Sequence, residues 1–81
     1  MLERRISGPR QRVFKAATLE FKNGGGVSGL VKNLSGSGAT LQVENVLGIP
    51  DEFYLVIGSD HFKRACRTAW RKPNRIGVKF L

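Results

Sequence analysis

The sequence has few of the residues that form disulfide bonds or bind metal ions in small proteins. Among its 81 residues there is one cysteine, Cys66, and one histidine, His61. A single cysteine excludes an internal disulfide and is typical of the reducing cytoplasm, where we expect the protein to be found. One cysteine and one histidine are also too few ligands for the usual protein metal sites. We therefore expect no metal and no cofactor.

Long apolar runs are missing too. No stretch approaches the roughly 20 apolar residues that cross a membrane, and the opening MLERRISGPRQR has no apolar segment after it. The sequence thus predicts neither membrane insertion nor a secretory signal. No grouping of serine, histidine and acidic residues suggests catalysis, so we expect a protein that binds rather than an enzyme.

Each of two parts of the chain lacks charge of one sign. Residues 61–81 contain seven basic residues and no acidic one, whereas residues 40–60 contain four acidic residues and no basic one. Residues 1–12 add four arginines against one glutamate, and the whole chain has a net charge of +8. This uneven distribution indicates either a partner rich in phosphate or only a solubilising surface.

Apolar and polar residues alternate along most of the chain, and a period of two is typical of half-buried strands. Six segments are predicted to be strands, namely 13–22, 27–34, 38–44, 53–57, 61–71 and 75–81. A closed, six-stranded antiparallel barrel is the favoured all-β fold because closure removes exposed strand edges, and a small sandwich is the alternative. Residues 1–12 are expected to form a flexible, arginine-rich arm, and residues 13–81 the barrel domain.

The same alternation assigns an inner face to the later strands. Side chains expected to point into the core include Phe53, Leu55, Ile57, Phe62, Cys66, Thr68 and Trp70. We therefore expect Trp70 to be a core residue and Cys66 to be buried and inert.

The arginines near the N-terminus are the first candidate site. Arg4, Arg5, Arg10 and Arg12 surround the flexible pair Gly8-Pro9. The planar guanidinium group donates two parallel hydrogen bonds, which suits phosphate and the O6/N7 edge of guanine. A solvated basic tail is the alternative interpretation.

The segment KNLSGSGATLQVE, residues 32–44, is the second candidate. Asn33, Ser35 and Gly38 form N-x-S-x-x-G between two predicted strands, with more small residues than a tight turn needs. An amide suits the edge of a base, a serine supplies a hydroxyl, and a glycine permits close backbone approach. Ordinary turn chemistry would favour the same residue types.

Together the two features resemble the PilZ domain family, in its short single-domain form. Three longer segments also look like parts of a PilZ domain, namely VKNLSGSGATLQVE, LGIPDEFYLVI and CRTAWRKPNRIGVKFL. The likeness therefore covers roughly residues 4–81. The resemblance implies a six-stranded barrel that binds the bacterial second messenger cyclic di-GMP.

The resemblance also implies roles for the two motifs. The family's arm pattern is R-x-x-x-R, whereas here Arg5 precedes Arg10 by five positions, so one residue is extra. Arg5 and Arg10 would contact phosphates and guanine edges, with Arg4 and Arg12 as substitutes if the register is shifted. Asn33 and Ser35 would bond the base or phosphate, and Gly38 would allow the ligand to approach closely.

On this basis we expect a cyclic di-GMP receptor that changes its surface on binding and signals to a protein effector. A PilZ-like interaction module that no longer binds the nucleotide is one alternative. A small basic barrel that binds nucleic acid is another, less favoured because most aromatic residues fall on predicted inner faces.

Overall fold

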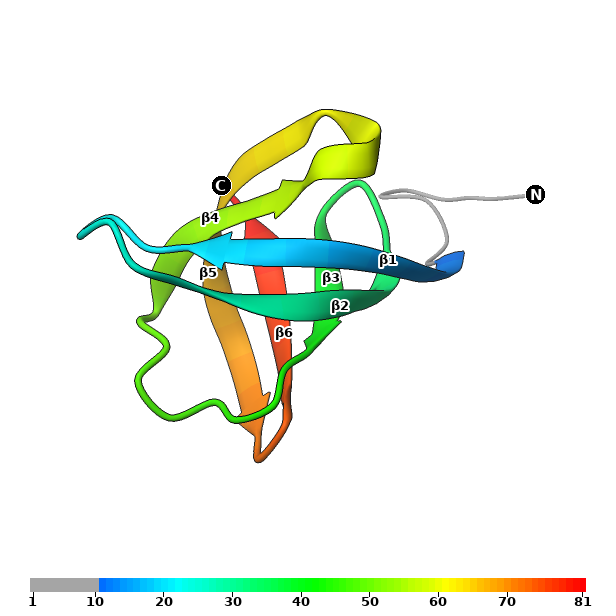
Figure 1. The fold of residues 1–81 in the computed structure, drawn as a ribbon. Helices are drawn as coiled ribbons and strands as arrows, with labels where there is room; N and C mark the ends of the chain where they lie inside the picture. Colours follow the sequence, from blue (N-terminus) through cyan, green and yellow to red (C-terminus); the bar gives the residue numbers. More distant parts are fainter. Residues whose placement is uncertain (1–10) are drawn as a thin grey trace.

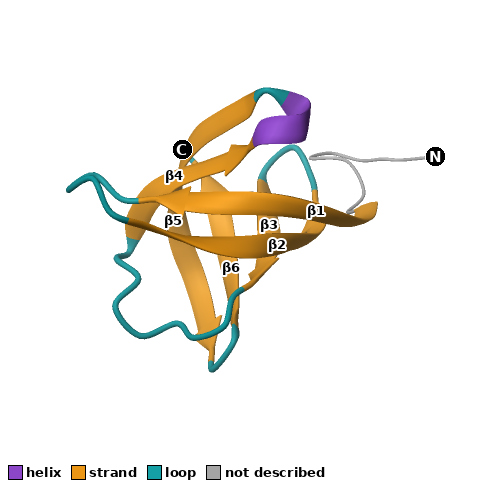
Figure 2. Cartoon of the chain, viewed as in Figure 1, coloured by secondary structure: helices purple, strands orange, loops and turns teal. Residues whose placement is uncertain are grey.

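The computed structural model describes residues 11–81, and Arg4, Arg5 and Arg10 lie outside the described residues. The described chain consists of six strands and a single 3-10 turn at Gly58–Asp60 (Figures 1 and 2). The strands are β1 (Gln11–Glu20), β2 (Gly26–Leu34), β3 (Gly38–Gln42), β4 (Glu52–Ile57), β5 (Phe62–Lys72) and β6 (Arg75–Phe80). All six predicted strands are therefore present. No helix in residues 11–81 is long and apolar enough to cross a membrane.

The strands close into a barrel in the order β1-β2-β3-β6-β5-β4, and every neighbouring pair is antiparallel. Four of the six contacts join strands that follow one another in the sequence. The β1–β4 and β3–β6 pairs complete the ring. The predicted barrel is confirmed, and the sandwich alternative is wrong.

The barrel interior is filled by one apolar cluster. Its buried members are Ala17, Leu19, Val31, Ala39, Leu41, Val43, Ile49, Phe53, Leu55, Ile57, Cys66, Ile76 and Val78. Most alternate along their strands with exposed or half-buried residues, as a period of two requires. Each fully buried aliphatic side chain stabilises the fold by about 1.5–3 kcal/mol, so this cluster is the main source of stability.

Trp70 departs from the prediction. The β5–β6 register shifts between Thr68 and Trp70, so the strict alternation along β5 is interrupted there. The indole consequently lies on the outer surface, 39% exposed, where it covers the backbone of Gly77 on β6. The expectation that Trp70 belongs to the core is wrong, whereas the expectation that Cys66 is buried is confirmed.

Candidate functional site

The β2–β3 turn is held together by Ser35. The Ser35 amide donates to the Gly38 carbonyl at 2.9 Å. The Ser35 hydroxyl lies 3.3 Å from the amides of Ser37 and Gly38, which donate to it. The serine of N-x-S-x-x-G thus supplies the acceptor that closes this turn, which is the local reason for the motif's serine.

Gly38 is buried where β3 meets β6. A Cβ atom at this position would overlap the carbonyl oxygen of Val78, which is backbone and cannot move aside. The absence of a side chain at Gly38 therefore allows β6 to pass close to β3. Its expected role in admitting a ligand remains a prediction.

Asn33 and Arg12 meet in the β1–β2 ladder, where they are paired directly opposite each other. Asn33 is also paired with Thr40 of β3. Arg12 is exposed and Asn33 is half-buried. Strand pairing thus brings the last arginine of the N-terminal group beside the first residue of N-x-S-x-x-G, although 21 positions separate them in the sequence.

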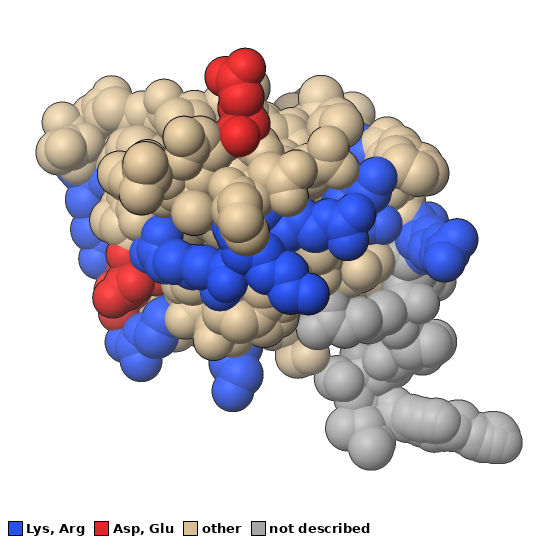
Figure 3. Space-filling view, turned by 90° about the horizontal axis from the view of Figure 1, so that it is seen from below, with Lys and Arg blue, Asp and Glu red and all other residues tan. Residues whose placement is uncertain are grey.

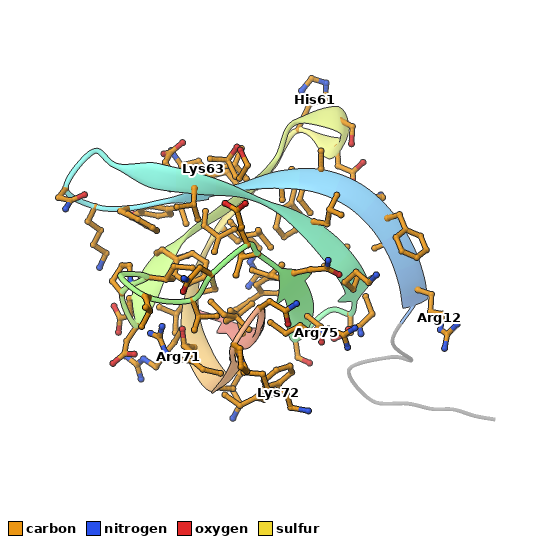
Figure 4. All side chains as sticks on the ribbon, turned by 60° about the horizontal axis from the view of Figure 1, so that its bottom comes forward. Arg12, His61, Lys63, Arg71, Lys72 and Arg75 are labelled. Carbon is orange, nitrogen blue, oxygen red and sulfur yellow. The ribbon has the colours of Figure 1, made fainter. Side chains whose placement is uncertain are left out.

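A pocket of about 290 Å³ lies over this pair, and its lining residues are Arg12, Phe14, Lys32, Asn33 and Arg75. The Lys32 ammonium lies 4.5 Å from the centre of the Phe14 ring, so a cation and an aromatic face occupy one wall. In Figure 4, Arg12, Arg75 and Lys72 lie along the lower side of the barrel, whereas Lys63 and His61 lie at the top. The pocket is therefore lined by several hydrogen-bond donors, namely the side chains of Arg12, Lys32, Asn33 and Arg75.

The same outer face continues across the sheet to Trp70. Thr40 of β3 is paired with Gly77 of β6, and Gly77 is paired with Trp70 of β5. The Lys72 ammonium lies 5.6 Å from the indole ring. A row from Arg12 through Asn33 to an exposed indole thus crosses five adjacent strands.

Most acidic side chains of the described chain already have a cation. Asp51 pairs with Arg71 at 2.9 Å, and the other ion pairs are Lys15–Asp60, Lys22–Glu52, Lys63–Glu20 and Arg67–Glu52. The hydrogen bond from Arg67 lowers the pKa of Glu52, and the one from Lys15 lowers the pKa of Asp60. The charges of these carboxylates are therefore balanced by the cations with which they form ion pairs.

Several cations have no side-chain carboxylate partner within residues 11–81, namely Arg12, Lys32, Arg64, Lys72, Arg75 and Lys79. Figure 3 shows lysine and arginine side chains running across one face of the molecule, with little acidic surface between them. Such a face attracts phosphate.

The structure thus brings together two of the predicted site residues, Arg12 and Asn33, with Ser35 and Gly38 in the adjoining turn. Lys32 and Arg75 line the same pocket and were not predicted from the sequence. The absence of acidic residues from 61–81 was a signal for Arg75, but only the strand register shows which cations share a face.

In a comparison with known families, the chain matches the model described as PilZ domain over residues 4–81. A search of the curated proteins finds no match. The matched residues include the whole barrel and all four N-terminal arginines.

Proposed function

Because the chain belongs to the PilZ domain family, we propose that it is a receptor for cyclic di-GMP that passes the signal to a protein partner. PilZ domains are known for binding this messenger and are binding or adaptor modules rather than enzymes. One structural observation carries the proposal for this chain. The β1–β2 ladder sets Arg12, the last of the N-terminal arginines, opposite Asn33, the first residue of N-x-S-x-x-G.

The chemistry of the messenger suits this face. Cyclic di-GMP has two phosphates and two guanine bases, and each guanine presents the O6 and N7 acceptors that a guanidinium fork fits. Arg12 and Arg75 are cations without a carboxylate partner in the described residues, and both line the pocket that contains Asn33. The Asn33 amide would bond a base edge or phosphate, and Ser35 would position it by closing the turn.

Trp70 extends the proposed site. Its indole lies outside the barrel in the row that begins at Arg12 and Asn33, and it is partly exposed. Exposed aromatic faces stack on bases, with a contribution of about 1–3 kcal/mol per base. A guanine placed over this end of the row would be held by stacking and by the Lys72 charge.

The proposed signal is a change of surface. Arg4, Arg5 and Arg10 lie outside the described residues, and the chain from them enters β1 immediately before Arg12. The messenger's phosphates would hold these arginines against the Asn33 face. The surface formed in this way is what the protein partner would recognise.

One observation favours a second candidate function. Arg5 and Arg10 are one position further apart than the family's R-x-x-x-R pattern. A domain that cannot place both arginines on the ligand would act through protein contacts alone.

Calorimetric titration of the full chain with cyclic di-GMP separates these functions. The receptor proposal predicts saturable heat with cyclic di-GMP and at least about tenfold weaker binding of cyclic di-AMP at the same salt concentration, since adenine lacks the O6 acceptor. Asn33→Ala should weaken binding about tenfold or more, whereas Asn74→Ala, an exposed turn asparagine, should not.

Flat heat for the folded wild-type chain would favour the module that has lost the ligand. Binding of a single-stranded oligonucleotide that exceeds binding of cyclic di-GMP, and that collapses as salt rises, would favour a nucleic-acid protein.

A further inference from the structure

Strand β2 has an open edge over part of its length. It is paired with β1 from Gly26 onward, but β3 is paired only with the part from Leu30 to Leu34. Beyond Gln42 the chain leaves β2, and Figure 1 shows the long β3–β4 loop swinging away beneath it. Within residues 11–81, the segment 26–29 therefore has a ladder partner on one side only.

The backbone of this segment presents hydrogen-bonding groups to that open side. The Phe21 amide donates to the Gly25 carbonyl at 2.7 Å, in the same register that pairs Thr18 with Ser28. Hydrogen-bonded and non-hydrogen-bonded pairs alternate in an antiparallel ladder. Phe21 and Gly25 form a hydrogen-bonded pair, and Gly26 and Ser28 lie one and three residues further along β2, at non-hydrogen-bonded positions. The amide and carbonyl groups of Gly26 and Ser28 therefore face away from β1.

Nothing in the segment protects this edge. Its sequence, GVSG, has no charged residue and no proline. The only register break in the β1–β2 ladder lies at its other end, between Arg12 and Lys15. Exposed strand edges without charge, proline or a bulge are templates for pairing with another chain.

A groove follows the open edge. It consists of two adjoining pockets of about 460 and 370 Å³, which share Ser28, Val43 and Glu44 as lining residues. Leu30 and Leu47 lie at its ends and are 40% and 82% exposed. The strand edge forms one wall, and the beginning of the β3–β4 loop forms the other.

Glu44 distinguishes this groove from the rest of the surface. Every other acidic side chain of residues 11–81 has an ion pair, whereas Glu44 has no cation partner among these described residues. On a chain with a net charge of +8, the groove thus contains a carboxylate without a cation.

We propose that the open edge of β2 docks an extended segment of a partner protein by strand addition. The segment would bond the backbone of Gly26 and Ser28, place a lysine or arginine opposite Glu44, and cover Leu30 and Leu47 with apolar side chains. A second copy of this chain fits less well, because its own 26–29 edge would bring no cation to Glu44.

A phage-displayed library of random octapeptides, selected on the immobilised full chain, is the probe for this groove. Selected peptides should combine β-branched residues at alternate positions with a lysine or arginine. A synthetic copy of the best peptide, titrated into ¹⁵N-labelled protein, should shift the amide signals of residues 26–30 and 43–47. It should also slow hydrogen exchange at the Ser28 amide.

Two variants test the contacts separately. Glu44→Lys should weaken the peptide at least tenfold, whereas Asp60→Lys, with the same charge change at the β4–β5 turn, should change affinity less than twofold. Ser28→Pro removes the outward amide and should abolish binding, with the thermal midpoint measured to verify folding. If Ser28→Pro does not fold, the Glu44→Lys result decides.

A library without binders, signals that shift elsewhere, or equal effects of Glu44→Lys and Asp60→Lys would each overturn the proposal. A wild-type dimer in sedimentation that Glu44→Lys leaves intact, with the edge amides protected, would assign the edge to a second copy and overturn it as well. None of these outcomes depends on cyclic di-GMP.

Discussion

At the scale of single residues, the N-x-S-x-x-G turn has two kinds of requirement. Ser35 and Gly38 are explained by the barrel itself, one as the acceptor for turn amides and the other by the passage of β6. Asn33 is paired opposite Arg12 in the β1–β2 ladder, on the outer face of the barrel. Two of the motif's three residues are therefore required by the barrel itself.

Gly38→Ala should destabilise the protein by about 1–3 kcal/mol or more, because the added methyl group overlaps the Val78 carbonyl and the strands must separate. Gly58→Ala is the matched control, since a Cβ there meets no atom within 4 Å. Urea denaturation measures both free energies of unfolding. Equal values for the two variants would contradict the packing at Gly38.

Cys66 is the buried titratable group of the core. Its Sγ lies 3.4 Å from the Phe53 carbonyl oxygen, and desolvation raises the pKa of the thiol from 9.0 to about 11. The thiol of the unfolded chain loses its proton first as the pH rises. The unfolded state then binds fewer protons than the folded state, so the stability decreases between pH 9 and 11.

We expect the unfolding free energy of the wild type to fall more steeply over this pH window than that of Cys66→Ala. The comparison cancels every contribution that both proteins share. Urea titrations at pH 8, 9, 10 and 11 measure the difference. Parallel curves would mean that the thiol is not held neutral by the core.

At the scale of elements, alternation was sufficient to predict the strands and most inward positions. Buried residues such as Leu41, Leu55 and Ile76 fall where a period of two places them. Trp70 was misplaced because alternation assumes an uninterrupted strand, and the register shift after Thr68 is set by pairing with β6. A single bulge moves every later side chain to the other face.

Leu41→Ala should cost about 2–5 kcal/mol, since its side chain is fully buried between two strands and leaves a cavity. Leu47→Ala makes the same chemical change in the β3–β4 loop, where the side chain is exposed, and should change stability by less than about 0.5 kcal/mol. Thermal unfolding of the two variants checks the difference. If Leu41→Ala changed the stability as little as Leu47→Ala, β3 would not close the core.

The site could be predicted only in part from the sequence. Arginine and asparagine chemistry identified Arg12 and Asn33 as candidates. Local patterns contain no information about which distant strands become neighbours, so Arg75 was missed. Lys32 directly precedes Asn33, but strict alternation places consecutive residues on opposite faces, and the register shift between Val31 and Asn33 interrupts that alternation. The place of Arg75 in the pocket follows from the β1-β2-β3-β6 order, which is a property of the closed barrel.

At the scale of the whole molecule, the uneven charge of the sequence becomes a division of the surface. The carboxylates of Asp51, Glu52 and Asp60 are used in local ion pairs, although residues 40–60 have no basic residue of their own. Cations without such partners remain on the face that includes Arg12 and Arg75. Exposed ion pairs contribute little to stability, so their main effect here is on where net positive charge remains.

Fluorescence of Trp70, the single tryptophan, tests most directly whether cyclic di-GMP binds this face. We predict saturable quenching in the wild type, with a half-saturation concentration about tenfold or more higher in Arg12→Ala, because a hydrogen bond to a charged group contributes about 1.5–3 kcal/mol. Lys63→Ala removes the same charge from the opposite side of the barrel (Figure 4) and should titrate like the wild type. Unchanged Trp70 emission in a wild-type chain that calorimetry shows to be saturated, or equal curves for Arg12→Ala and Lys63→Ala, would contradict the account.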